Sequence, residues 1–593
     1  MKELKENLAA VEAYRTADTV NFEGFAAWTP SDAARLEQLA MTGTLGHSFY
    51  ASAREQTAAA LELLDRAEPE ALAKAIVRGR QEGFIRALPL LGLVKLSVKS
   101  PERFQAVFDQ VVVTGNDLGD FLDLVRSVRG LGRGVKRAIH NWLDRKLTPY
   151  YAMKYRTALA DAIRLSRYRG EDPLCAFVLA AYPGVKGEST EKLRAAEEKY
   201  PVLKARAEFV AALESGDTAA AAKLLADYGL DTDSLTAFGD RFDREVWSAA
   251  ASTAPVMKFL KYLAKYAREG VEVDRIAAEK LTVDALRRAK VFPFRLYTAA
   301  TALEQQLETF ERDMGIREYQ MKAKIGDLLL QKSKLDNVWR SPTVGEALFG
   351  ETLPEDEELA TRKQTLETRA RKIQEQLAEL ERTAVEDTKR IREAQTRVCA
   401  RLSQLLDEYA AKYDWEVFNR FSWVIAPDVS GSMSSRIANS ALTFSELSAM
   451  FVGFFLKGLD DVRVLPWEER AHEYTVPASA PVAEHMLAIR NMTGGGTYME
   501  APLNYMLERG IAADFAVFLT DTEEYGRGWF AKWKQYRQRF PEAQAFLLRA
   551  DSYQSSPISE EDAAKYGVWQ IFGWNDSVIE YMRCILMRRN EKK

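Results

Sequence analysis

The chain has 593 residues, of which 47% are hydrophobic and 28% charged, and its formal net charge is −4. This length suits three or four globular domains, and the near-neutral charge indicates no general class of partner. Its three cysteines, Cys175, Cys399 and Cys584, are isolated, which excludes a disulfide framework or a paired zinc motif. No apolar run reaches the length of a membrane span, and Met1–Glu6 lacks the apolar core of a signal peptide. We therefore expect a cytoplasmic protein without a membrane partner.

The first 300 residues are expected to form an all-α module. From about residue 30 to 300 the apolar residues follow helical spacing, with abundant Ala, Leu and Arg and few strand signals. Short breaks divide this stretch into helices, at Gly79, Pro89, Gly115, Gly130, Pro149, Gly170 and Pro183. Helices of this length in series are typical of an α-solenoid, although no clean repeat period is visible.

Residues 126–169 are strongly basic. They include twelve Lys or Arg and two Asp, a net charge of +10 in a chain whose total is −4. Trp142 and four tyrosines (Tyr150, Tyr151, Tyr155 and Tyr168) are interleaved with the basic residues. Because Lys and Arg neutralise phosphates and unpaired bases stack on aromatic planes, this pattern is typical of RNA binding. A solvated helix face over core aromatics is the plainer alternative.

Three motifs in this half resemble a known family. Arg129–Trp142 (RGLGRGVKRAIHNW) is similar to the signature of TROVE modules, and Arg86–Gly92 and Val291–Arg295 fit the same family. The resemblance implies HEAT-like helical repeats that form a ring. It also implies non-catalytic binding of small noncoding Y RNAs and of single-stranded ends of misfolded RNA, in bacteria with a tethered exoribonuclease.

By position, the resemblance implies which residues contact RNA. Arg133, Lys136 and Arg137 map to the basic helix that meets Y RNA, and Lys154 and Arg164 map to the neighbouring helix. The RNA-binding candidates are Arg129, Arg133, Lys136, Arg137, Lys154, Arg156, Arg164 and Arg167. The chain departs from the family between Arg156 and Asp161, where a histidine-bearing turn is missing, and at residues 292–294, where Phe-Pro-Phe replaces His-Pro-Phe. General RNA binding depends on charge more than on one side chain and is less affected by these departures.

Residues 301–400 predict an inserted antiparallel coiled coil. Its apolar positions follow a heptad register: Leu366, Ile373, Leu377, Leu380, Ala384, Ile391, Val398, Leu402 and Leu405. An earlier charged helix from about Leu303 to Leu335 would supply the second strand, after a Gly- and Pro-containing break. A helix of about 50 residues spans about 75 Å, so the hairpin would project from the core. We expect it to bind a protein partner or a second copy of the chain.

The last third predicts a parallel sheet with oxygen ligands at one edge. Apolar runs at Phe421–Pro427, Val462–Pro466 and Phe515–Thr520 read as buried strands, with helices between them, in a doubly wound α/β order. Ligands gather beyond the carboxyl ends of such strands. Asp428 and Asp521 lie at those ends, and carboxylate and hydroxyl oxygens suit a hard divalent cation.

Five residues of this last third, including both aspartates, resemble the metal-ion-dependent adhesion site of von Willebrand factor A domains. They are Asp428, Ser430, Ser432, Thr497 and Asp521. The resemblance implies Mg²⁺ held directly by Ser430, Ser432 and Thr497, with the two aspartates acting largely through bound water. One coordination position would stay open for an acidic group on a partner. Phe572–Asp576 is similar to the last strand and loop of the Ro family, in which a helical-repeat ring is closed by an A domain.

We therefore expect three parts: a TROVE-like helical module (1–300), the coiled-coil hairpin (301–400) and a von Willebrand factor A-like domain (401–593). The function expected is that of a non-catalytic RNA-binding scaffold in RNA quality control or processing. One alternative is a metal-dependent protein-interaction module that acts with a partner such as an AAA+ ATPase. Another is a Mg²⁺-dependent hydrolase with Asp428 as nucleophile, which would want a carboxylate where Ser430 stands.

Overall fold

The computed structural model describes residues 16–591, apart from a set of short segments. These are 22–23, 25, 43–44, 46–51, 84, 181–189, 231–234, 290, 292, 339–355, 437–441, 523–527, 550–554 and 573–577. Most of the resemblance at Phe572–Asp576, and part of that at Val291–Arg295, lies outside the described residues. A short ribbon of β1 (Thr19–Val20) and β2 (Ala26–Ala27) precedes the first described long helix.

Beyond this ribbon, the N-terminal half is helical, as predicted. Its helices are α2 (Asp32–Thr42), α3 (Ala53–Arg66), α4 (Pro69–Gln81), α5 (Ala87–Lys99), α6 (Pro101–Val111), α7 (Gly115–Val128), α8 (Arg133–Lys146), α9 (Pro149–Lys154), α10 (Arg156–Ser166), α11 (Leu174–Leu179), α12 (Thr190–Lys199), α13 (Pro201–Ser215), α14 (Thr218–Tyr228), α15 (Arg244–Thr253), α16 (Val256–Arg268), α17 (Val273–Lys280) and α18 (Val283–Arg288). Proline occupies the first turn of α4, α6, α9 and α13, where its missing N–H costs nothing. Reciprocal capping boxes at Ser52–Glu55 and Thr114–Asp117 begin α3 and α7.

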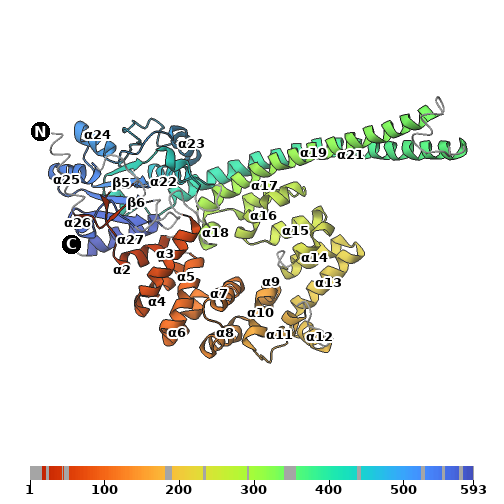
Figure 1. Ribbon diagram of the computed structural model, residues 1–593, viewed down its shortest axis with the longest axis horizontal. Coiled ribbons are helices and arrows are strands. Elements are labelled where there is room, and N and C mark those ends of the chain that lie inside the picture. Colours follow the sequence, from red (N-terminus) through yellow and green to blue (C-terminus); the bar gives the residue numbers. More distant parts are fainter. Residues whose placement is uncertain are drawn as a thin grey trace.

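These helices follow one another round a ring whose two ends meet the C-terminal domain (Figure 1). At the first end, α2 packs against the last strand of the sheet, where the Gln38 side-chain amide donates to the Gln570 carbonyl at 3.3 Å. At the other end, α17 and α18 pack against the long helix that leads into that domain. One apolar core runs from Leu36 to Leu203, and a second begins at Phe209 and continues into the sheet.

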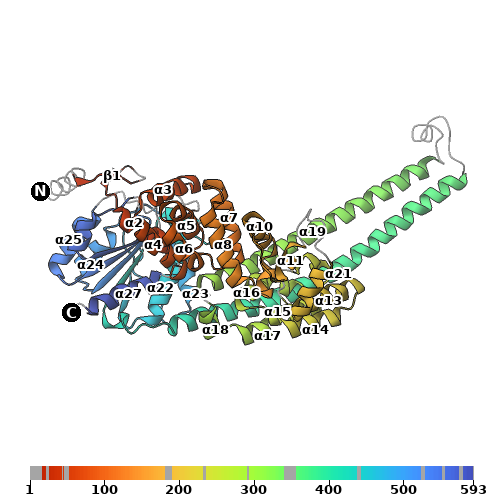
Figure 2. The ribbon, with the colours of Figure 1, turned by 90° about the horizontal axis from the view of Figure 1, so that it is seen from below.

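Two long helices form the hairpin, α19 (Pro293–Val338) and α21 (Asp356–Ala411). Both views show it projecting beyond the ring as an arm (Figures 1 and 2). The expected boundaries at residues 301 and 400 fall inside these continuous helices, so the arm is rooted in both neighbouring modules. The last turns of α21 are buried, with Val398, Leu402 and Leu405 inside the core that joins the ring to the sheet.

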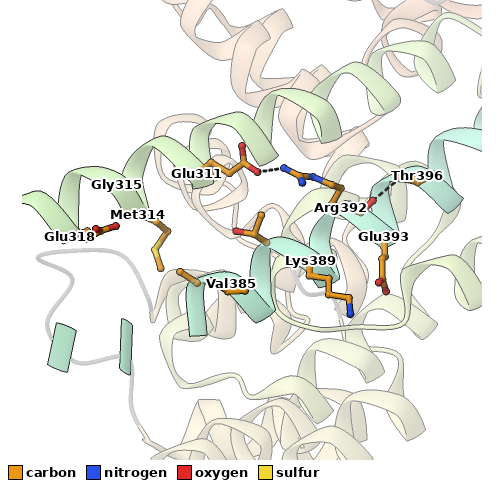
Figure 3. A pocket seen from close by; sticks show the side chains of 11 residues that line it. Glu311, Met314, Gly315, Glu318, Val385, Lys389, Arg392, Glu393 and Thr396 are labelled. Atoms are coloured by element: carbon orange, nitrogen blue, oxygen red, sulfur yellow. Dashed lines mark hydrogen bonds and ion pairs between the residues drawn. The ribbon is translucent and has the colours of Figure 1, made fainter. Parts of the chain in front are cut away.

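The seam between the arm helices opens where α19 carries Gly315. A cavity of about 720 Å³ lies there, lined on α19 by Met314 and Gly315 and on α21 by Ala384 and Val385 (Figure 3). An ion pair at 2.6 Å between Glu311 and Arg392 spans the two helices beside it. Small side chains therefore leave the helices incompletely packed at this level.

The C-terminal domain contains a five-stranded, all-parallel sheet in the order β4-β3-β5-β6-β7. Its strands are β3 (Trp423–Pro427), β4 (Val462–Val464), β5 (Phe515–Thr520), β6 (Gln544–Arg549) and β7 (Val568–Phe572). Side chains of β3 and β5 alternate between two cores, one on each face of the sheet. Burial on both faces explains why these strands read as continuous apolar runs.

Helices cover both faces of the sheet. They are α22 (Phe444–Gly458), α23 (Val482–Met492), α24 (Ala501–Arg509), α25 (Trp529–Arg539), α26 (Glu560–Lys565) and α27 (Val578–Glu591). The predicted doubly wound order is confirmed, with two helices rather than one between β4 and β5. None of the helices described here combines the length and hydropathy that a bilayer crossing requires.

Candidate metal centre and basic surface

The carboxyl end of β3 carries the first part of the oxygen-ligand set. Asp428 is fully buried, and its Oδ1 accepts a hydrogen bond from the Ser430 backbone N–H at 2.8 Å. The chain then makes a single 3-10 turn (Gly431–Ser434), which brings the Ser430 and Ser432 hydroxyl oxygens to 3.2 Å from each other. Two hydroxyls and a carboxylate thus share one tight turn at the edge of the sheet.

A glycine loop, Gly494–Gly496, lies just before Thr497 and is bound directly to this turn. The Gly494 N–H donates to the Val429 carbonyl at 2.7 Å, and the Gly431 N–H donates to the Gly495 carbonyl at 3.2 Å. Gly495 adopts φ +79°, and a Cβ there would stand 2.7 Å from Glu468 Oε2, so this position requires glycine. Thr497 follows two residues later and is buried.

The third part comes from the end of β5, beside β3 in the sheet. Asp521 is buried and follows Thr520, whose hydroxyl donates to Asp428 Oδ2 at 2.6 Å. Burial, and then the negative charge of Asp521, raise the pKa of Asp428 well above its ordinary value. The structure therefore brings the three predicted segments to one edge, and the residues present fit a divalent cation, which would offset the cost of two buried carboxylates.

The donor set differs in kind from a cluster of charged or soft ligands. Within the described part of the chain, no group of three His, Cys, Asp or Glu is placed to hold a metal ion. Any cation at the β3–β5 edge would therefore rely on hydroxyl oxygens and water as well as on carboxylates, which is the chemistry of Mg²⁺ rather than of Zn²⁺.

Sequence reasoning missed two supporting residues of this edge. Thr520 was read only as the end of a strand, but its hydroxyl holds Asp428. Arg549 ends the neighbouring strand β6, is 1% exposed, and donates through Nε to the Thr522 hydroxyl at 3.0 Å. Thr522 has φ +60°, an uncommon conformation for a β-branched residue, and its N–H donates to the Thr520 hydroxyl. A hydroxyl immediately before Asp521 was the available signal for Thr520, whereas Arg549 became visible only through strand order.

The basic segment splits into an exposed surface and a structural part. Arg133 and Arg137 are exposed on α8, Lys136 is half-buried beside them, and α8 lies on the outer rim of the ring (Figure 1). His140 Nε2, one turn further on, lies 3.1 Å from the Ser166 carbonyl at the end of α10. The exposed Arg164 and Arg167 therefore lie next to the α8 residues.

Other candidates are engaged within the fold. The Arg129 guanidinium donates to the Ser97 carbonyl, and that of Arg156 donates to the Phe177 carbonyl at 2.6 Å while stacking on the Phe177 ring. Burial, together with nearby Arg206, lowers the pKa of Arg156 to about 10. Lys154 donates to the Tyr150 hydroxyl at 2.7 Å.

The interleaved aromatics are mainly structural. Trp142 is fully buried and donates to the Val112 carbonyl at 2.7 Å, and the Tyr151 hydroxyl donates to the Val113 carbonyl at 3.1 Å. Tyr155 fills the space above Gly115, where a Cβ would stand 2.3 Å from it. Tyr150 remains exposed. The plainer alternative, core aromatics under a solvated face, thus describes most of these rings.

A helical ring closed by a doubly wound domain, with hydroxyl and carboxylate oxygens at the carboxyl edge of its sheet, defines a protein of the ring-plus-A-domain class. Comparison with known proteins gives the same result. Residues 422–585, which include the whole sheet, match the family model described as the Ro60 vWA domain.

Two relatives extend the comparison. The chain is 28% identical over 298 residues to the RNA-binding protein RO60 of Deinococcus radiodurans, an alignment that covers 46% of this chain and 54% of that protein. The chain thus spans about half the length of the curated relative it matches. The crystal structure of the Deinococcus radiodurans RO (RSR) protein is similar in fold, with a TM-score of 0.53 and 17% identity over 94% of this chain and 99% of that one. The expected Ro-like architecture is confirmed.

Proposed function

We propose that the chain is a non-catalytic RNA-binding protein that holds small noncoding or misfolded RNA on the outer surface of its ring. The main observation in support of RNA binding is the basic surface formed by Arg133, Lys136 and Arg137 on α8 with Arg164 and Arg167 at the end of α10. The name of the Deinococcus relative, an RNA-binding protein, supports the same class of ligand.

The surface has the properties that phosphate binding requires. Arg133, Lys136, Arg137 and Arg167 have no ion-pair partner in the described part of the chain. Nearby Arg145, by contrast, is paired with Asp109. Unpaired cations on adjacent helices can contact successive phosphates and release their counterions, so affinity would come from charge and fall with salt.

Magnesium would have a supporting role at the A domain. Ser430, Ser432 and Thr497 would hold the ion, with Asp428 and Asp521 acting mainly through water. When bound, the ion supplies positive charge and an open position for an acidic group on a partner, such as an exoribonuclease or another protein. Asp428 accepts hydrogen bonds on both of its carboxylate oxygens. This arrangement suits a ligand scaffold better than a nucleophile.

The test reverses charge on α8. The triple variant Arg133→Glu, Lys136→Glu, Arg137→Glu should weaken binding of a structured small RNA by at least about 100-fold at 0.1 M salt. It should also lower the slope of log affinity against log salt by about 2. Filter binding over a salt series measures both quantities.

The matched control places the same charge change on the arm. Arg369→Glu, Arg371→Glu, Lys372→Glu lies on the exposed face of α21 and should bind RNA like the parent. If both triple variants bind RNA as tightly as the parent, the α8 surface is not the RNA site.

The arm favours a second candidate, a metal-dependent protein-interaction module acting with a protein such as an AAA+ ATPase. It projects beyond the ring (Figures 1 and 2) and takes no part in the basic surface of α8 and α10. That function predicts a partner captured from lysate that is released by chelator and by Asp428→Asn, with or without ribonuclease. Release by ribonuclease alone would support the RNA scaffold instead.

A further inference from the structure

The arm helix α19 carries two apolar faces. One faces α21 and includes Met314, Met321, Ile325, Leu328 and Leu335, which are buried or half-buried at steps of three, four or seven residues. This face is the seam of the hairpin, as a heptad pattern predicts.

The second face of α19 is exposed. Ile316, Tyr319 and Leu330 are 49%, 74% and 55% exposed, and Ala323 and Gly326 between them are exposed as well. We call these five residues the outer strip. Their spacing of three, four, three and four residues is again a heptad pattern, so they lie on one side of the helix, away from the α21 seam.

The outer strip has no counterpart on α21. On α21, among the residues described, Val385 is the one large apolar side chain that is exposed, and it lines the cavity of the seam. The other exposed side chains of α21 are charged, polar or alanine. Apolar residues at heptad spacing on a solvent-facing helix mark a surface that binds another helix.

We propose that two copies of the chain associate arm to arm, with their outer strips packed antiparallel. The sequence of the strip is complementary to itself in this direction. A pairing centred between Ala323 and Gly326 places these two small residues against each other, so that the backbones approach closely. It also places Tyr319 against Leu330 of the second copy, at both ends of the contact.

Charge supports the same register. Asp313 and Lys334 lie beside the outer strip near its two ends and are both exposed. In the antiparallel pairing, Asp313 of each copy faces Lys334 of the other, which gives two opposite-charge pairs related by the twofold axis. A parallel in-register pairing would leave these two residues about 30 Å apart along the helices, so they could not pair.

The geometry of the molecule leaves room for this contact. The arm extends beyond the ring and the sheet domain in both views (Figures 1 and 2). The paired segment of 22 residues covers about six turns and 33 Å. Such a contact lies at the low end of stable interfaces, below about 1,200 Å² in total, so we expect a dimer that dissociates on dilution through the micromolar range.

The first experiment measures the mass of the nuclease-treated full chain by sedimentation velocity between about 1 and 100 μM. The parent should shift from monomer to dimer, whereas Gly326→Gln should weaken the dimer at least tenfold, because its side chain occupies the space of Ala323 from the second copy. Within one copy, a Cβ at Gly326 meets nothing within 4 Å, so the variant should fold. Gly315→Gln is the control, since a Cβ there also meets nothing and Gly315 lies off the strip.

A charge exchange tests the register. Asp313→Lys and Lys334→Asp should each weaken the dimer severalfold, and the double variant should restore it, because the pairs re-form with reversed sign. A parent chain that stays monomeric at 100 μM would overturn the proposal. So would a Gly326→Gln variant that dimerises like the parent, or a double variant that fails to recover.

Discussion

At the residue scale, Asp428 is held in place by the protein but lacks favourable conditions for its charge. Its two oxygens accept from the Ser430 N–H and the Thr520 hydroxyl, while burial and Asp521 disfavour the ionised form. An ionised carboxylate that is buried in this way costs folding free energy unless a bound cation offsets its charge. The residue is therefore the sharpest probe of the candidate metal centre.

We predict that Asp428→Asn separates metal binding from stability. The parent should unfold at a higher temperature with magnesium than with chelator, because a ligand that binds only the folded state stabilises it. The variant should lose this difference, and in chelator it should be at least as stable as the parent. Differential scanning fluorimetry measures both effects. Asp514→Asn is the control, since Asp514 lies at the opposite end of β5 and accepts from Ser422. An unchanged magnesium shift in Asp428→Asn would contradict the assignment.

A second residue, Asp117, holds the start of the ring together. It is fully buried, accepts from Arg80 at 2.8 Å and from Arg86 at 2.7 Å, and caps α7 through the Thr114 N–H. Burial opposes its ionisation, but the two guanidinium groups and the backbone N–H outweigh burial and hold the pKa of Asp117 below its usual range. This gives a structural role to Arg86, the first residue of one of the family-like motifs.

Asp117→Asn should therefore destabilise the helical module by about 3–5 kcal/mol at pH 7, since it leaves two guanidinium groups without their buried partner. A carboxylate with a lowered folded pKa stabilises above its unfolded pKa of about 3.9 and loses that effect as pH falls through the folded value. The gap between parent and variant should thus shrink below about pH 4. Urea unfolding at pH 7 and in acid tests both statements. Asp123→Asn, on the exposed face of the same helix, should change stability by less than about 0.5 kcal/mol.

At the element scale, α21 is one continuous helix with two environments. Its first part pairs with α19 in solvent, and its last turns lie in the core between ring and sheet. Asp407 near its end accepts from the Val482 N–H at the start of α23, at 2.8 Å, and Trp415 just beyond it packs against Gly458 at the end of α22. The helix therefore connects the arm to the A domain without a flexible joint.

This division predicts unequal costs for the same substitution along one helix. Leu402→Ala should destabilise the chain by about 2–5 kcal/mol, because Leu402 is 1% exposed and a cavity would remain. Leu380→Ala, at another apolar position of the heptad pattern on the arm, is half-buried and should cost clearly less. Denaturant midpoints measure the difference, and equal costs would show that the two ends of α21 do not differ as described.

At the scale of the whole molecule, the ring is closed by the A domain at both ends. Trp28 and Ser556 exchange backbone hydrogen bonds at 3.0 and 2.8 Å, and the Ser31 N–H donates to Glu560 at 2.8 Å. On the other side, α17 and α18 pack on α21. The arm takes no part in this closure beyond its root.

Shortening the arm should therefore leave the ring and its RNA binding intact. Joining Gln320 to Glu381 through a short glycine-rich loop removes residues 321–380. The two joined ends lie opposite each other across the hairpin, as the ion pair between Lys322 and Glu381 shows. We expect an unfolding temperature within a few degrees of the parent, unchanged RNA affinity and no dimer. Loss of RNA binding in this variant would instead place the RNA site on the arm.

The sequence by itself determined the local elements and the chemistry of the sheet edge. Periodicity, Gly and Pro breaks and the heptad pattern predicted the helices, and the buried strands predicted the doubly wound domain, because these signals act over a few residues. Asp428, Ser430 and Asp521 were found because carboxyl ends of parallel strands meet at one edge. Their role as metal ligands, like the RNA role of the α8 residues, stays a prediction.

The tertiary structure alone decided which side chains are free to bind RNA and which lie at the candidate metal centre. Arg156 and Arg129 have the same charge as Arg133 and Arg137, but helix packing directs the first two onto backbone carbonyls. Thr520 and Arg549 lie at the candidate metal centre because of the order of the strands in the sheet. Ring closure likewise brings Trp28 to Ser556. These contacts link residues far apart in the chain, so they depend on how whole elements pack, which local sequence does not encode.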